Sequence, residues 1–116
     1  MIILEKAWAK LYGSYKNIEA GYPEECLHDL TGAPIKQIIM SHYRFNPDNE
    51  WNYLLEASQK EYSMVASSQP GSDINQSVSG VVQGHAYTFL NATYVNYEDG
   101  SDKEKIVQLR NPWGKV

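Results

Sequence analysis

The sequence Gly84-His85-Ala86-Tyr87 opens one run of strand-forming residues, and Arg110-Asn111-Pro112-Trp113-Gly114 closes the next run. Between them lies Asp99-Gly100, a dipeptide typical of a tight turn between antiparallel strands. With a turn at this position, His85 and Asn111 fall within a few residues of facing each other, and a β-bulge can absorb the difference. We therefore predict a hairpin that brings an imidazole and a carboxamide to the same edge of a sheet.

The second half of the chain is predicted to be mainly β structure. Its expected segments are a strand at 62–66, a polar loop at 67–80, a strand at 86–97, an acidic turn at 98–102 and a strand at 105–110. Pro112 ends the last strand, because proline has no N–H group to donate to a neighbouring strand. The loop at 67–80 is either a mobile flap beside His85 or a plain linker.

The first half is predicted to be mainly helical. Its expected segments are helices at 3–12 and 23–30, a strand at 34–40, and a third helix that starts near Asn46-Pro47-Asp48. Pro23 in the first turn and Gly32 just past the end are typical boundaries of the second helix. The fold class that follows is α+β, with N-terminal helices packed on a twisted antiparallel β-sheet.

Composition excludes several classes of function. The 116 residues suit one domain or part of one, and the net charge of −4 with scattered basic residues argues against a nucleic-acid partner. No apolar run approaches the roughly 20 residues of a transmembrane segment. The single cysteine, Cys26, rules out an internal disulfide and fits a reducing, cytoplasmic location.

His85 and Asn111 are the residues best suited to chemistry. A neutral imidazole can take a thiol proton and return it to a leaving amine, and a carboxamide oxygen bonded to the other ring nitrogen fixes the tautomer. Trp113 is expected to shield that hydrogen bond from water. Of the three histidines, only His85 follows a glycine, Gly84, which permits close approach of another backbone. Residue types alone leave a second interpretation open, in which this histidine is structural.

Other polar residues receive structural interpretations. Cys26, with Leu27 beside it, is expected to be a packed cysteine rather than a nucleophile. His28 and His42 lack metal-ligand spacing and are expected on the surface or at helix ends. The acidic residues of the hairpin turn are interpreted as solvated, because the pattern of an EF-hand is missing. No metal ligand is therefore assigned, and the glycosylation-like sequences at Asn75 and Asn91 are attributed to chance.

Five strings in order resemble the second half of a calpain-type, papain-like cysteine protease core. The resemblance runs from about Ile3 to Gly114. The strings are Leu4-Glu5-Lys6-Ala7-Trp8-Ala9-Lys10, Gly13-Ser14-Tyr15, Asp29-Leu30-Thr31-Gly32, Gly84-His85-Ala86-Tyr87 and Arg110-Asn111-Pro112-Trp113-Gly114.

The resemblance implies half of a papain-like core: residues 1–116 would be the C-terminal lobe of a calpain-like catalytic domain, truncated at both ends. His85 resembles the catalytic histidine and Asn111 the catalytic asparagine, while Gly84 and Trp113 resemble residues that contact substrate. The family's nucleophilic cysteine belongs to a preceding lobe, so this chain is expected to be inactive alone. Calcium is implied for the intact enzyme, with no site identified within this chain.

The expected function is therefore that of the His/Asn-bearing lobe of a calcium-dependent cysteine endopeptidase. Its expected partners are protein substrates and the missing nucleophile-bearing lobe, which would cover an exposed apolar surface. The alternative is a non-catalytic calpain-like module that binds proteins or peptides. A Gln followed by Cys-Trp upstream would favour the enzyme, whereas a replaced cysteine would favour the module.

Overall fold

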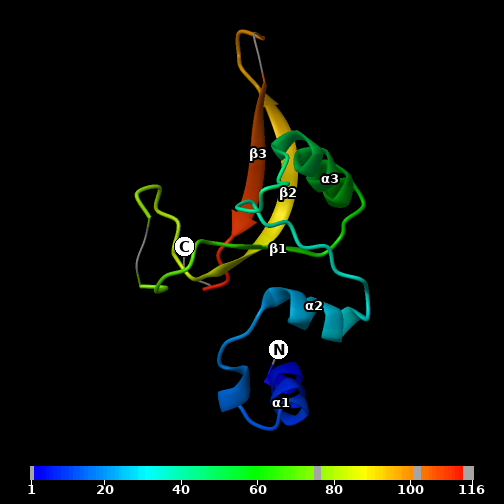
Figure 1. The fold of residues 1–116 in the computed structure, drawn as a ribbon, viewed down its shortest axis with the longest axis vertical. Helices are drawn as coiled ribbons and strands as arrows, with labels where there is room; N and C mark the ends of the chain where they lie inside the picture. The colour runs from blue at the N-terminus through cyan, green and yellow to red at the C-terminus, as the bar shows by residue number, and fades with distance from the viewer. Residues whose placement is uncertain (1, 75–76, 101–102, 114–116) are drawn as a thin grey trace. The chain divides into compact units, whose positions relative to one another are not determined.

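The computed structural model of the chain describes residues 2–74, 77–100 and 103–113. The chain divides into two compact units, Met1–Gln37 and Ile38–Val116, and each is a structural unit of its own (Figure 1). The predicted α+β class is confirmed, because the described residues form three α-helices and a three-stranded antiparallel sheet.

The first unit contains helices α1 (Ile2–Leu11) and α2 (Pro23–Thr31), close to the predicted ranges. A short 3-10 helix at Lys16–Ile18 separates them and was not predicted. Helix α2 ends at Gly32, whose φ of 66° is left-handed and whose N–H donates to a carbonyl of the last turn. The predicted glycine boundary is therefore confirmed.

A tyrosine connects the two helical segments of this unit. The hydroxyl of Tyr12 donates to Asp29 Oδ2 at 2.5 Å, and the Tyr12 ring lies 5.1 Å from that of Trp8. The hydrogen bond to the Asp29 carboxylate raises the pKa of Tyr12, because losing the phenolic proton would break this bond and place two negative charges together. The unit is therefore held by a polar contact as well as by packing.

The prediction of a strand at 34–40 is wrong, since the structure has no strand there. Pro34 lacks an N–H donor, and the side chains of Ile35, Ile39 and Met40 are 41%, 50% and 68% exposed. An apolar run forms a strand only where a neighbouring strand pairs with it, and this segment has neither that pairing nor a buried face.

The second unit begins with helix α3 (Pro47–Gln59), whose predicted start is confirmed. Asn46 is its N-cap: the side-chain oxygen accepts hydrogen bonds from the N–H groups of Asp48 and Asn49 at 3.1 and 3.0 Å. Pro47 occupies the first turn, where its missing N–H costs nothing. Local sequence therefore specifies where this helix begins.

The sheet contains strands β1 (Met64–Ser67), β2 (Ala86–Asn96) and β3 (Lys103–Arg110) in the order β1-β2-β3. Strand β1 lies slightly later than predicted, and β3 begins two residues earlier. The predicted hairpin is confirmed, and Gly100, with φ of 72°, donates its N–H to the carbonyl of Tyr97 in the turn. The β2–β3 register shifts between Phe89 and Asn91, an irregularity of the kind that the sequence analysis allowed for.

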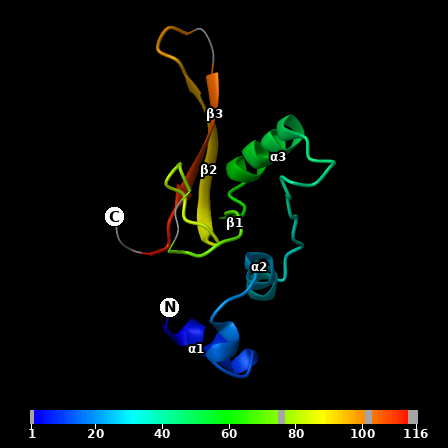
Figure 2. The ribbon, with the colours of Figure 1, turned by 60° about the vertical axis from the view of Figure 1, so that its left-hand side comes forward.

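Helix α3 packs against one side of β2, and the loop between β1 and β2 lies on the other side (Figures 1 and 2). Ser58 Oγ donates to Asn91 Oδ1 at 2.8 Å and accepts from the N–H of Ala92 at 3.2 Å, next to the bulge. Trp51 meets the ring of Tyr94 edge-on at 5.4 Å. These contacts bury Trp51 and Ala92 and hold the longest strand in place.

Replacing the N-cap, Asn46→Ala, should lower the free energy of unfolding by about 1 kcal/mol, because two N–H groups of the first turn lose their acceptor. Urea unfolding followed by circular dichroism measures this loss. Asn52→Ala in the exposed middle of α3 is the matched control and should leave stability unchanged or slightly higher. Equal effects of the two changes would contradict the capping role.

The ion pair between Asp48 of α3 and Lys105 of β3 should make stability depend on pH in acid. The hydrogen bond from Lys105 Nζ at 2.6 Å, and then its charge, lower the pKa of Asp48. Because this folded-state pKa lies below the unfolded value of about 4, the stabilisation is complete above that value. It is lost as the pH falls through the lowered pKa. Urea midpoints of the wild type and D48N should therefore differ at neutral pH and converge in acid.

Both side chains of the Asp48–Lys105 pair are exposed, so molar salt should reduce the difference in urea midpoint between the wild type and D48N at neutral pH. Asp73→Asn, which removes an exposed carboxylate from the loop after β1, is the control and should leave the urea midpoint at neutral pH unchanged. If the difference in urea midpoint between the wild type and D48N stayed constant down to the lowest pH, the ion pair would not be the cause of the pH dependence.

Candidate active site

The side chains of His85 and Asn111 meet at the base of the hairpin. His85 immediately precedes β2 and Asn111 immediately follows β3, and the paired ends of these strands, with Thr88 opposite Arg110, bring the two residues together. His85 Nε2 lies 2.9 Å from Asn111 Oδ1, and both residues are partly buried. The predicted meeting of imidazole and carboxamide is therefore found in the structure.

The backbone of Trp113 determines which way the Asn111 amide faces. Its N–H donates to Asn111 Oδ1 at 3.3 Å. This hydrogen bond closes a turn formed by the Asn111 side chain, with Pro112 at its centre. An N–H group can only donate, so the atom that it meets is the carbonyl oxygen. Because that same oxygen faces His85 Nε2, the ring nitrogen must carry the proton and donate it.

The tautomer has a chemical consequence. A neutral imidazole protonated at Nε2 has an unprotonated Nδ1, which is the nitrogen able to accept a proton. Among the residues that the structure describes, Nδ1 of His85 has no hydrogen-bond partner. The arrangement therefore holds one ring nitrogen by hydrogen bonding and leaves the other available as a base.

Two aromatic rings flank the imidazole. Tyr87 meets His85 edge-on, with ring centres 4.9 Å apart, and Trp113 is tilted against it at 5.0 Å. The Tyr87 hydroxyl accepts a hydrogen bond from the N–H of Val82 at 3.0 Å, which ties the preceding loop to the strand. Trp113 is 51% exposed, so it covers one side of the ring while remaining accessible.

Gly84 has no room for a side chain. Its φ is +54°, and a Cβ atom there would lie 2.2 Å from the carbonyl oxygen of Gly71. The predicted close approach of another backbone is therefore confirmed, and that backbone is the loop after β1. Any larger residue at position 84 would push this loop away from His85.

The two remaining histidines lie on the surface, one of them just before the end of a helix, as expected. His28 Nδ1 lies 3.0 Å from the carbonyl of Ala33 just past the end of α2, and His42 Nδ1 accepts from the N–H of Arg44 at 3.2 Å. Cys26 is a free, half-buried cysteine within α2. Within the second unit, the described contacts of the His42 ring do not include His85.

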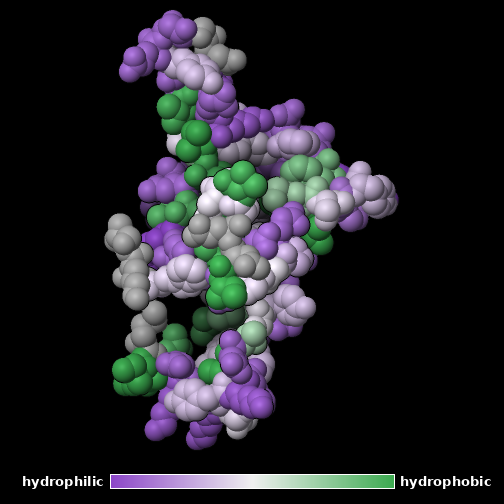
Figure 3. Space-filling model, turned by 90° about the vertical axis from the view of Figure 1, so that its left-hand side faces the viewer, coloured by the Kyte–Doolittle hydropathy of each residue, from purple (hydrophilic) through white to green (hydrophobic). Residues whose placement is uncertain are grey.

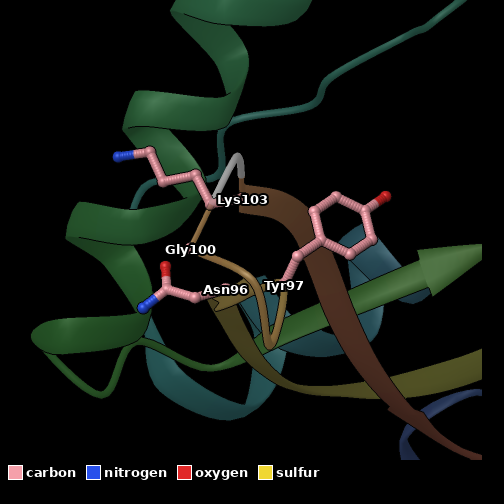
Figure 4. A pocket seen from close by; sticks show the side chains of 4 residues that line it. All are labelled: Asn96, Tyr97, Gly100 and Lys103. Carbon is pink, nitrogen blue, oxygen red and sulfur yellow. The ribbon is translucent and has the colours of Figure 1, made fainter.

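The described residues do not fit a calcium ion. Within residues 2–74, 77–100 and 103–113, no three or more histidine, cysteine or carboxylate side chains gather as a metal site. A pocket at the hairpin tip is lined by Asn96, Tyr97, Gly100 and Lys103, but its side chains diverge (Figure 4). Glu104 accepts from the Tyr97 hydroxyl at 2.7 Å, a bond that raises the pKa of this tyrosine. Asp102 of the predicted acidic turn lies outside the described residues, as do Asn75 and Gly114.

Two features of the site were missed by sequence reasoning. Tyr87 lay within a quoted string, yet no role was assigned to its ring or hydroxyl. Its spacing of two residues from His85, at the start of a strand-like run, was the available signal, since residues two apart point to the same face of a strand. The backbone contacts of His85 with the end of β1 could not be derived from local sequence.

Asn111→Ala should remove the fixed tautomer of His85, because the acceptor for Nε2–H is lost. Long-range ¹H–¹⁵N correlation spectra in mildly alkaline buffer should change from an Nε2–H pattern to that of a tautomer mixture. Trp113→Phe is the matched control: it keeps the backbone N–H that orients Asn111 and should keep the pattern. An unchanged spectrum in N111A would contradict the assignment.

The family model and the relatives that match this sequence all belong to one protein family. The chain matches the calpain family of cysteine proteases over residues 1–116. It is 43% identical over 115 residues to a calpain-type cysteine protease of Oryza sativa subsp. japonica, covering 96% of this chain and 5% of that protein. It is 37% identical over 114 residues to calpain-14 of Homo sapiens, covering 98% of this chain and 16% of the relative. The chain therefore spans a small part of the length of these relatives.

Proposed function

This chain belongs to the calpain family of cysteine proteases, and we propose that it is the lobe that supplies the general base of a calpain-like endopeptidase. In this proposal His85 is the catalytic base and acid, and Asn111 orients it. The observation that carries it is the 2.9 Å contact between His85 Nε2 and Asn111 Oδ1, which leaves Nδ1 as the acceptor. The thiol comes from a nucleophile-bearing lobe outside this chain.

The proposed reaction follows from the tautomer. Nδ1 of His85 takes the proton of the thiol, and the thiolate attacks the carbonyl carbon of the scissile peptide bond. The resulting imidazolium gives this proton to the leaving amine as the C–N bond breaks, which leaves an acyl-thioester. Water, deprotonated by Nδ1, then hydrolyses the thioester and restores the thiol. Throughout, Nε2–H remains bonded to Asn111.

Gly84 and Trp113 are proposed to contact the peptide substrate. Both lie beside His85, and Gly84 presents backbone without a side chain while Trp113 offers a half-exposed ring. The Gly71 carbonyl fills the side on which a Cβ of Gly84 would project, so in this proposal an extended peptide meets Gly84 on its remaining exposed side. Protein substrates are the class that this arrangement suits.

The second proposed partner is the nucleophile-bearing lobe. All eight residues of β3 are exposed, and apolar side chains interrupt the polar surface along the hairpin (Figure 3). The apolar and aromatic residues of the hairpin and its end that are at least 40% exposed are Leu90, Val95, Tyr97, Ile106, Val107, Leu109 and Trp113. We propose that the nucleophile-bearing lobe covers part of these exposed apolar side chains.

Calcium dependence and a cytoplasmic location also remain proposals. The family resemblance implies calcium for an intact enzyme, and we place its ligands outside the described residues because these offer no fitting group. No helix among the described residues has the length and apolar character to cross a bilayer. Neither proposal enters the chemistry assigned to His85 and Asn111.

Co-expression of this chain with the nucleophile-bearing lobe of a calpain-type relative should give calcium-dependent cleavage of a casein-like substrate. His85→Ala should lower the rate by about 10²–10⁴-fold, because proton transfer loses its base. His42→Ala is the matched control, since His42 is exposed and bonds only within its own turn. Fluorescent peptide release measures the rates.

The same experiment distinguishes the enzyme from a binding module. A complex that forms and cleaves only with His85 intact supports catalysis. If the complex forms with the cysteine and His85 both present and yet stays inert, the non-catalytic calpain-like module becomes the better description.

A further inference from the structure

One residue of the chain holds both polar backbone groups of His85. The N–H of Ser68 donates to the carbonyl oxygen of His85 at 2.9 Å. The Ser68 hydroxyl accepts from the N–H of His85 at 3.0 Å and lies 3.1 Å from that same carbonyl oxygen. Ser68 is partly buried and directly follows β1, whose last paired residue is Ser67 opposite Ala86.

The Ser68 hydroxyl accepts the hydrogen bond that a backbone carbonyl would accept in a regular sheet. Continued antiparallel pairing would place Ser68 opposite His85, and the N–H of His85 would then bond to the Ser68 carbonyl. Here the serine hydroxyl takes that N–H instead. The two chains diverge at this point, because Gly84 turns into the left-handed region and its N–H donates to the carbonyl of Gln69 at 2.8 Å.

His85 is therefore held from both neighbouring strands of the sheet. From the β3 side, Asn111 holds ring atom Nε2. From the β1 side, Ser68 holds the backbone from which the ring projects. A ring that reaches a 2.9 Å contact at one nitrogen and directs the other elsewhere requires its Cα to be fixed, since a small displacement of the backbone moves the ring by a similar amount.

We propose that Ser68 is a positioning residue for His85: its hydroxyl replaces the missing ladder carbonyl and keeps the imidazole in register with Asn111. The inference rests on the proposed function only for its effect on rate, because the positioning itself is a property of the ring. Ser68 touches neither substrate nor the reacting atoms in this scheme. Its contribution should appear in turnover rather than in substrate binding.

Four variants separate positioning from general stability. S68A removes the hydroxyl, S68C keeps nearly the same size with a weak hydrogen-bonding group, and S68T restores a hydroxyl. Ser67→Ala is the matched control, because Ser67 is the exposed neighbour on β1.

The first measurement uses the 116-residue chain and does not need activity. Amide hydrogen exchange of His85 should become faster in S68A and S68C, while the amide of Ala92, in the middle of β2, keeps its protection. The Nε2–H pattern of the His85 ring should change to a tautomer mixture in both variants and persist in S68T and S67A. A variant that unfolds would expose both amides together, and S68C then supplies the decisive comparison.

The second measurement uses the co-expressed complex with the nucleophile-bearing lobe. S68A should lower kcat by about 10- to 100-fold with little change in KM, as expected for a slightly misplaced base. S68T should recover most of the rate. A loss of rate in S68A no greater than that in S67A would overturn the proposal.

The spectrum of the His85 ring tests the positioning role of Ser68 even if the wild-type complex is inert. Inert wild type with an altered His85 tautomer in S68A refutes the proposed function and supports the positioning role. A His85 amide and ring spectrum that are unchanged in both S68A and S68C overturn the positioning role, whatever the activity of the complex.

Discussion

The antiparallel pairing of β2 with β3 is the interaction on which the rest of the structure depends. It converts a separation of 26 residues in sequence into the 2.9 Å contact between His85 and Asn111. Side chains alternate along a strand, so a slip of one residue in this pairing would turn Asn111 to the other face of the sheet. The register shift between Phe89 and Asn91 therefore helps to determine where Asn111 lies, although the shift itself is away from the imidazole.

Helix α3 stabilises this register from one side. Ser58 bonds to the side chain of Asn91 and to the backbone of Ala92, next to the irregularity, and the ion pair of Asp48 with Lys105 joins the start of the helix to β3. The buried contact is small, with Trp51 and Ala57 as the buried residues of the helix. Polar contacts therefore contribute to the positioning of the strands alongside a limited apolar core.

The features that could be predicted from sequence are those that neighbouring residues specify. Asp99-Gly100 indicated the hairpin, and Asn46-Pro47 indicated the start of α3, because turn and capping chemistry act over a few residues. The segment 34–40 was mispredicted because a strand needs a partner that no local pattern reveals. The contacts of Ser68 with His85 join residues 17 apart through a break in regular pairing, so neither alternation nor turn residues could indicate them.

The exposed third strand has a consequence for the chain before it meets any partner. Of the described strands β3 lies at one end of the sheet, and its sequence places Ile106-Val107 between charged residues at 103–105 and Arg110. Charges that flank a short apolar run act as gatekeepers against stray β-addition and fibril growth. A newly synthesised chain thus carries its own protection against aggregation along the strand that ends at Arg110, just before Asn111.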